Sequence, residues 1–79
     1  MKTVKLKFPI NSKGRQIDSL TVRRPKIQDR LAVEHIQGSD ILKEVALLAN
    51  LCEIDHDEIS QLDLVDYSAL QEVLNDFLS

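Results

Sequence analysis

The side chains that could support catalysis or metal binding are few and widely spaced in this chain. It has two histidines, His35 and His56, and one cysteine, Cys52. A structural zinc site needs four ligands and commonly contains Cys-x-x-Cys or His-x-x-x-His pairs. The chain has neither pair, and no fourth ligand lies at a useful spacing. We therefore expect no metal and no cofactor, with Cys52 as a small core residue and both histidines exposed to water.

A second group that could carry chemistry is the hydroxyl of Ser19, in the tripeptide Asp18-Ser19-Leu20. The same tripeptide carries the phosphopantetheine arm in acyl carrier proteins, which are also small and acidic. There the serine begins a helix in an all-helical bundle, whereas Ser19 lies among strand-patterned residues soon after a turn. We favour the strand interpretation. With no nucleophile, base and orienting group at hand, the sequence predicts a protein that is not an enzyme.

The chain has one basic cluster, formed by Arg23, Arg24, Lys26 and Arg30. Such a cluster could bind phosphate or an acidic patch on a partner, because arginine can hold a carboxylate with two hydrogen bonds. The alternative is that these residues are the solvated start of a helix. We keep Arg23 and Arg24 as candidate partner-binding residues.

Size and charge limit the class of protein. The chain has 79 residues, enough for one small domain, with a net charge of −3 and a pI near 5.2. A general nucleic-acid binder has a strongly basic balance, so we expect no nucleic-acid partner. One cysteine excludes an internal disulfide and suits a reducing cytoplasm. No run approaches the roughly 20 apolar residues that cross a bilayer, and no signal peptide is visible, so we expect no membrane partner.

Residues 1–24 are predicted to form a two-stranded antiparallel β-hairpin. The apolar residues of the first strand alternate with other residues, and they are Val4, Leu6, Phe8 and Ile10. This period of two is typical of a half-buried strand, which we expect to end at Pro9 or to lie at an edge. A turn at residues 11–14 leads to a second strand over 16–23. Its pattern changes phase at Asp18-Ser19, which predicts a bulge of one extra residue there.

Residues 25–79 are predicted to form three to four helices, so that the whole chain is one α+β domain. The first helix is expected from Pro25 to Gln37, ended by Gly38, and its poor apolar pattern allows a break near the middle. A central helix is expected at Ser39–Glu53, a short one at His56–Gln61 and a last one at Leu64–Leu78.

Two signals mark the starts of the later helices. Asp55 followed three residues later by Glu58 resembles a capping box, and Ile54 with Ile59 can close a hydrophobic staple around it. Asp63 and Asp66 repeat the same spacing. In the last helix, Asp66 is predicted to lie off the apolar face, which consists of Leu70, Val73, Leu74 and Phe77.

The central helix is apolar around most of its circumference. Its main face consists of Ile41, Val45, Leu48 and Cys52. Leu47 and Leu51 fall outside that face, four residues apart, and form a second ridge. We therefore predict that Leu47 and Leu51 contact a partner, with burial beneath the hairpin as the alternative.

The order of these features resembles that of a known family. The matching features are the Arg23-Arg24-Pro25 junction after the hairpin, the Leu/Ala-rich segment 45–51, Ile59-x-x-Leu62, Asp66 and the terminal Phe77-Leu78. Over about Val4 to Leu78 the chain is similar to the small tail assembly chaperones of Mu-like and related contractile-tailed bacteriophages.

The resemblance implies a non-enzymatic chaperone that binds the long, helical, aggregation-prone tape measure protein before the tail tube assembles around it. It also implies a location in the cytoplasm of the bacterial host, absence from the mature virion, and in many cases a longer frameshift-extended form of the same chaperone. No catalytic residue carries over. Arg24, Pro25, Leu62 and Asp66 match the family pattern, and a structural role explains each of them at least as well as a functional one.

Two other functions stay open. The chain could be a small DNA-binding regulator that uses its basic cluster, although its acidic balance argues against this. It could also be an adaptor or a homo-oligomeric structural protein in which Leu47 and Leu51 pack against other copies. The spare apolar ridge is compatible with a helix-in-groove contact in either a chaperone or an oligomer.

Overall fold

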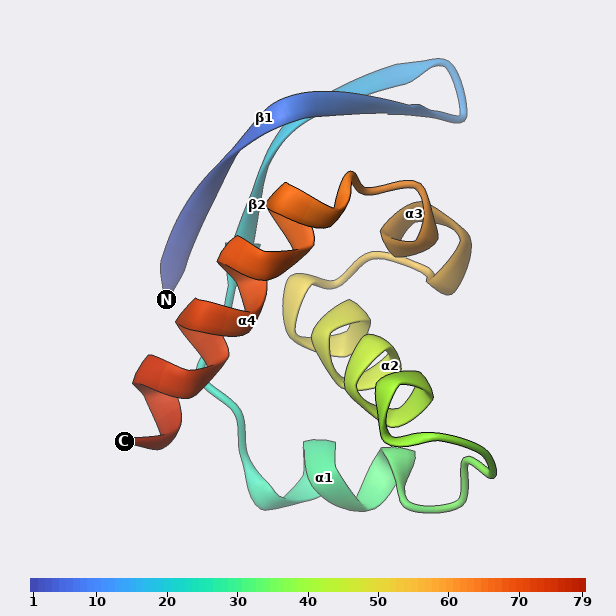
Figure 1. Ribbon diagram of the computed structural model, residues 1–79, viewed down its shortest axis with the longest axis vertical. Helices are drawn as coiled ribbons and strands as arrows, with labels where there is room; N and C mark the ends of the chain where they lie inside the picture. Colours follow the sequence, from blue (N-terminus) through green and yellow to red (C-terminus); the bar gives the residue numbers. More distant parts are fainter.

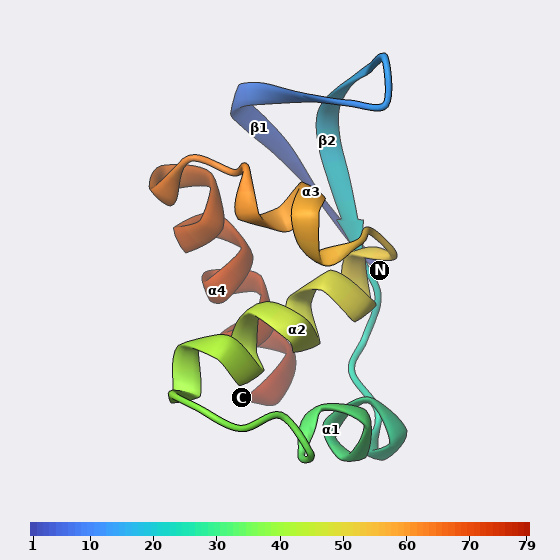
Figure 2. The same cartoon turned by 90° about the vertical axis from the view of Figure 1, so that its right-hand side faces the viewer.

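The computed structural model describes residues 1–79. Its two strands come first in the chain and its four helices follow. They are β1 (Lys2–Ser12), β2 (Arg15–Val22), α1 (Ile27–Val33), α2 (Asp40–Cys52), α3 (His56–Ser60) and α4 (Leu64–Leu78). β1 packs on α4 and β2 packs on α2 (Figure 1). Figure 2 shows the hairpin on one side of the helices and α1 at the far end of the molecule. The predicted α+β fold, a hairpin followed by helices, is confirmed.

The hairpin turns through a two-residue loop, Lys13-Gly14. Both residues have positive φ, 53° and 78°, as a type I′ turn requires, and this turn matches the twist of the two strands. Lys13 Nζ lies 3.2 Å from Asp55 Oδ2, at the start of α3. This exposed pair contributes little stability, but it shows that the tip of the hairpin reaches α3.

The pairing of the hairpin changes register once. Lys5 pairs with Ser19 and Ile10 pairs with Ile17, so residues 6–9 of β1 lie opposite Asp18 alone. The bulge predicted in the second strand is therefore wrong, because the extra residues are in the first strand. The irregularity also turns Phe8 outwards, and its side chain is 56% exposed although the alternation placed it on the buried face.

The carboxylate of Asp66 on α4 binds the backbone of β1 at this irregularity. Oδ1 accepts the Lys7 N–H at 2.8 Å and Oδ2 accepts the Phe8 N–H at 3.0 Å. Asp66 is 2% exposed, so the prediction that it lies off the buried face is wrong. It also closes no second capping box, since the cap residue Asp63 instead accepts the Val65 N–H at 2.9 Å. Buried N–H groups and carboxylates need partners, and here each satisfies the other.

The later helices begin and end close to their predicted positions. The last helix is confirmed at Leu64–Leu78, and the central helix covers Asp40–Cys52, with Ser39 at its N-cap position but without a side-chain cap bond. The capping box of α3 is confirmed. The Glu58 N–H donates to Asp55 Oδ1 at 2.9 Å, and the Asp55 N–H donates to Glu58 Oε1 at 3.1 Å.

Helix α1 is shorter than predicted at both ends. Lys26 is extended, and its N–H donates to the carboxylate of Asp29 at 2.8 Å, so the helix begins at Ile27 rather than at Pro25. It ends at Val33, where the predicted break in the apolar pattern falls. Val33 is the buried apolar residue of this helix, whereas Ile27 and Leu31 are exposed.

The core lies between the hairpin and helices α2, α3 and α4. Its members are Leu6, Leu20 and Val22 from the hairpin, Leu48, Ala49, Leu51 and Cys52 from α2, Ile59 from α3, and Tyr67, Leu70, Val73 and Leu74 from α4. The predicted apolar face of the last helix is thus confirmed. No helix of the structure is both long and apolar enough to cross a membrane.

Because Asp66 is the only side chain that binds the irregular part of β1, its removal should leave two N–H groups without partners. We expect Asp66→Ala to lower the free energy of unfolding by about 2–5 kcal/mol, since hydrogen bonds to a charged group contribute about 1.5–3 kcal/mol each. Asp76→Ala, at an exposed position of the same helix, is the control and should change it by less than about 0.5 kcal/mol. Urea melts of both variants measure the difference. Equal stability of the two would contradict the role given to Asp66.

Candidate functional site: an apolar groove between three helices

The predicted ridge of Leu47 and Leu51 does not exist as a free surface. Leu51 is 1% exposed and belongs to the core. The N–H of Arg23, the residue after β2, donates to the Leu51 carbonyl at 3.1 Å. Leu47 is half-buried and packs against the edge of the core. It lines a hollow of about 470 Å³ between α1, α2 and α4 whose other walls are mostly polar or charged. Of the two leucines, only Leu47 keeps surface that a partner could reach.

Arg23 is held within the chain by Asp29 of α1. Its Nη1 and Nη2 donate to the two carboxylate oxygens of Asp29 at 2.8 and 2.6 Å. These bonds, with the Lys26 N–H, hold the pKa of Asp29 below its usual value, and the same pair raises the pKa of Arg23. Two parallel bonds to a buried carboxylate fix the connection between β2 and α1. Both terminal nitrogens of the Arg23 guanidinium are therefore hydrogen-bonded within the chain.

Arg24 also contacts its own chain. Its guanidinium carbon lies 5.7 Å from the centre of the Phe77 ring, near the end of α4, within the range of a cation–π contact. In the same cluster, Arg30 Nε lies 3.0 Å from Glu34 Oε1. The basic cluster thus joins the hairpin to α1 and α4.

The structure does not bring the candidate metal ligands together, and no cluster of three or more His, Cys, Asp or Glu side chains could hold a metal ion. Cys52 is buried in the core, and burial raises the pKa of its thiol to about 11, which leaves it protonated at neutral pH. His35 and His56 are exposed. Ser19 is exposed in strand β2, as the strand interpretation predicted.

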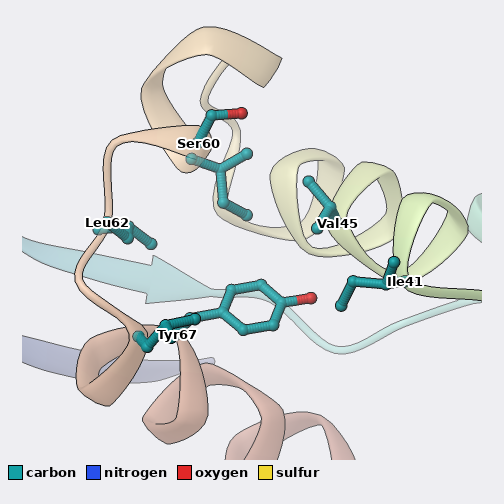
Figure 3. Close-up of a pocket in the computed structure, with 7 residues that line it drawn as sticks. Ile41, Val45, Ser60, Leu62 and Tyr67 are labelled. Carbon is teal, nitrogen blue, oxygen red and sulfur yellow. The ribbon is translucent and has the colours of Figure 1, made fainter.

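One apolar surface that the fold leaves open is a groove between α2, α3 and the start of α4. Six of its seven lining residues are hydrophobic, and its volume is about 200 Å³. The lining residues are Ile41, Val45, Ile59, Ser60, Leu62, Leu64 and Tyr67. Figure 3 shows Ile41 and Val45 on α2 facing the ring of Tyr67 on α4, with Leu62 and Ser60 closing the other side.

The rim of the groove is the exposed part. Ile41 is 50% exposed and Leu64 is 80% exposed, while Val65, next to Leu64, is 43% exposed. The floor is buried, with Ile59 at 3% and Tyr67 at 8% exposure. A site with a fixed floor and an open apolar rim can take up an apolar side chain or a helix ridge from another molecule.

Tyr67 is held in place by a polar contact at one end of the groove. Its hydroxyl donates to Glu44 Oε1 at 2.7 Å, and the Gln71 side-chain amide donates to the same oxygen at 2.8 Å. Burial and the neighbouring Glu44 raise the pKa of Tyr67, so its hydroxyl stays protonated as a donor. The ring therefore forms a rigid wall rather than a mobile side chain.

The groove was not predicted as a site, because periodicity places Ile41 and Val45 on the core face of the central helix. The apolar face of α2 extends beyond the elements that cover it, so the first turn of this helix stays exposed. Leu64 and Val65 are the one indication of this site in the sequence. These two apolar residues begin the last helix but lie outside its predicted apolar face.

Comparison with known proteins identifies the class. The chain matches the family described as phage tail assembly chaperone proteins, E, or 41 or 14, over residues 3–79. It therefore belongs to this family of phage tail assembly chaperones, and the resemblance found in the sequence is confirmed. No match to the chain was found among curated proteins. None was found among solved structures.

The burial of the two leucines predicts that they tolerate charge differently. Leu51→Lys should unfold the domain, because a charge in the core without a partner costs more than a small domain's total stability allows. Leu47→Lys should stay folded, since its side chain can extend from the half-buried position into water. Circular dichroism at 222 nm separates the two outcomes, and a folded Leu51→Lys variant would show that this leucine lies on the surface.

The lowered pKa values of Asp29 and Asp55 predict a loss of stability in acid. The pKa of Asp29 is lowered mainly by Arg23, and that of Asp55 mainly by the Glu58 N–H. A carboxyl group with a lower pKa in the folded state stabilises the fold above its unfolded pKa, about 4, and loses this contribution as the pH falls through the folded value. Urea melts from about pH 6 to 2 should show stability falling below about pH 4, less steeply in Asp29→Asn. An unchanged slope in that variant would contradict the assignment.

Proposed function

We propose that this protein is a non-enzymatic chaperone that holds an apolar helical segment of the phage tape measure protein in the groove between α2, α3 and α4. The observation that carries the proposal is the open apolar rim in a chain that belongs to the tail assembly chaperones. It would act in the cytoplasm of the bacterial host, before the virion is complete. A longer frameshift-extended form of the chain would carry the same groove.

Energetics support binding at this rim. Ile41 and Leu64 expose half or more of their surface. Complete burial of a side chain of this size contributes about 1.5–3 kcal/mol. Covering the rim therefore supplies a few kcal/mol, which suits a client that must later be released into the tail rather than one held permanently.

The shape of the groove supports a helix as its occupant. Two walls are helices, α2 and α4, and the lining side chains come from three separate elements (Figure 3). An amphipathic helix presents side chains three and four residues apart, which fit between such walls. Among the lining residues only Tyr67 carries an ionisable side chain, and it is buried and hydrogen-bonded. We therefore propose that the groove binds its client without catalysing a reaction.

A second candidate is self-association through α1, because Ile27 and Leu31 are 77% and 65% exposed and lie four residues apart. A DNA-binding role is less well supported. Arg23, Arg24 and Arg30 each contact another side chain of the chain, so the basic cluster is largely occupied.

Substitutions at the rim test the proposed function. In Ile41→Ser/Leu64→Ser the groove loses its apolar rim, while the fold should survive because both side chains are largely exposed. We expect this variant to lose most of its ability to keep the tape measure protein of the same phage soluble during co-expression. The soluble fraction of the tape measure protein is the measurement.

Leu31→Ser on α1 is the matched control, since Leu31 lies outside the groove and its exposure, 65%, is between the 50% of Ile41 and the 80% of Leu64. It should protect as well as the unmodified protein. Full protection by the rim variant, verified as folded by circular dichroism, would rule out the groove. Loss of protection by Leu31→Ser alone would point to α1 instead.

A further inference from the structure

The charges of this chain are divided between its two halves. All 10 Lys and Arg residues lie within residues 1–43. From Glu44 to Ser79 the chain has nine Asp and Glu residues and neither Lys nor Arg. Of these acids only Asp55 forms an ion pair, with Lys13, because the other ion pairs involve Asp29 and Glu34. The second half therefore carries negative charge that the fold does not compensate.

The groove lies almost entirely in this acidic half. Lys43, the last cation of the chain, is next to α1, with its Nζ 3.9 Å from Glu34 Oε2. Acids, by contrast, adjoin the lining. Glu44 is hydrogen-bonded to Tyr67, and Asp63 stands between the lining residues Leu62 and Leu64 in the chain. Asp40 precedes Ile41 in the chain and lines the neighbouring hollow between α1, α2 and α4.

Glu44 has capacity left for a cation. Its Oε1 accepts both internal hydrogen bonds, from Tyr67 and Gln71, and it forms no ion pair within the chain. Its Oε2 is therefore left to a group outside the chain. Glu44 lines the neighbouring hollow between α1, α2 and α4 and reaches the groove through its hydrogen bond to Tyr67. A Lys or Arg that flanks a helix ridge at the Tyr67 hydroxyl would meet this carboxylate, and a half-buried ion pair is stronger than one fully in water.

We propose that the groove selects a basic amphipathic helix, whose apolar ridge enters the groove and whose flanking Lys or Arg residues meet the acids around it. This inference rests on the proposed function and adds the chemistry of the client segment. The apolar ridge supplies the affinity, and the charges select the segment and its orientation. A client helix flanked by acids meets like charge on the rim and is rejected.

A second copy of the chain fits the groove less well than such a client. Its candidate helix, α1, is basic at Lys26 and Arg30, but it has only seven residues and Arg30 is paired with Glu34.

Three designed peptide helices test the proposal. They share one Leu/Ile ridge over about five turns and differ only in the flanking residues, which are Lys, Gln or Glu. Fluorescence anisotropy with the whole protein should give the tightest binding for the Lys peptide and the weakest for the Glu peptide. Raising the salt from about 50 to about 500 mM should bring the three affinities together, because salt screens exposed charges.

Charge variants locate the effect. Glu44→Gln/Asp63→Asn keeps an acceptor at both positions, so that the contacts to Tyr67 and to the Val65 N–H survive. It should weaken the Lys peptide by about two- to tenfold more than the Gln peptide, as expected for one or two partly exposed ion pairs. Glu72→Gln, at an exposed acid of α4 outside the lining, is the control and should change neither.

The outcomes separate this inference from the proposed function. If all three peptides bind equally and Ile41→Ser/Leu64→Ser weakens them equally, the groove binds helices and the charge selection is wrong. If no peptide binds and the rim variant still protects the tape measure protein, both are wrong. Glu44→Gln/Asp63→Asn could instead change self-association of the protein in size-exclusion chromatography, with peptides that fail to displace the second copy. In that case the occupant of the groove is a second copy of the chain, and the inference is overturned.

Discussion

The bond between the Asp66 carboxylate and the backbone of β1 is the constraint on which the rest of this structure depends. It joins residues 59 positions apart, and it is made where the hairpin ladder is interrupted. The alternation of a regular strand would have placed Phe8 on the buried face, and the adjacent N–H groups of Lys7 and Phe8 would not both have pointed at α4. With the interruption, Leu6 and Ile10 both stay buried while the strand follows the curve of the helices (Figure 1). One carboxylate thus sets the register of the hairpin and the position of α4 against it.

Helix α2 explains both the core and the groove. β2 covers one side of it, α1 another and α3 a third, which accounts for a helix that is apolar around most of its circumference. Leu51 is buried in the core, whereas Ile41, on the first turn, is half exposed at the rim of the groove that α3 also lines. The surplus apolar surface that the sequence indicates is real, but it lies at the start of the helix rather than along the ridge of Leu47 and Leu51.

The features that could be predicted from sequence are those encoded locally. The capping box of Asp55 and Glu58 needs only two residues three positions apart, and it correctly predicts that α3 begins at His56. Asp66 fits the same local rule with Asp63, yet a partner far along the chain takes it instead. Periodicity likewise gives the faces of a helix but not the element that covers each face, so the sequence left both a partner and the hairpin open as the cover of Leu51, which the structure buries in the core. The division of charge was visible in the sequence, but a net charge of −3 averages over two opposite halves and hides it.

The long reach of the hairpin contacts has a consequence for the order in which the nascent chain folds. The strand that is synthesised first finds its anchors last, since Lys7 waits for Asp66 and the hairpin tip waits for Asp55. Contacts of such high sequence separation form late, because the loop between them must close first. Until α4 has been translated, β1 has no helix to cover its apolar side, because only β2 packs on α2. A tail assembly chaperone thus exposes apolar surface of its own while it is being synthesised.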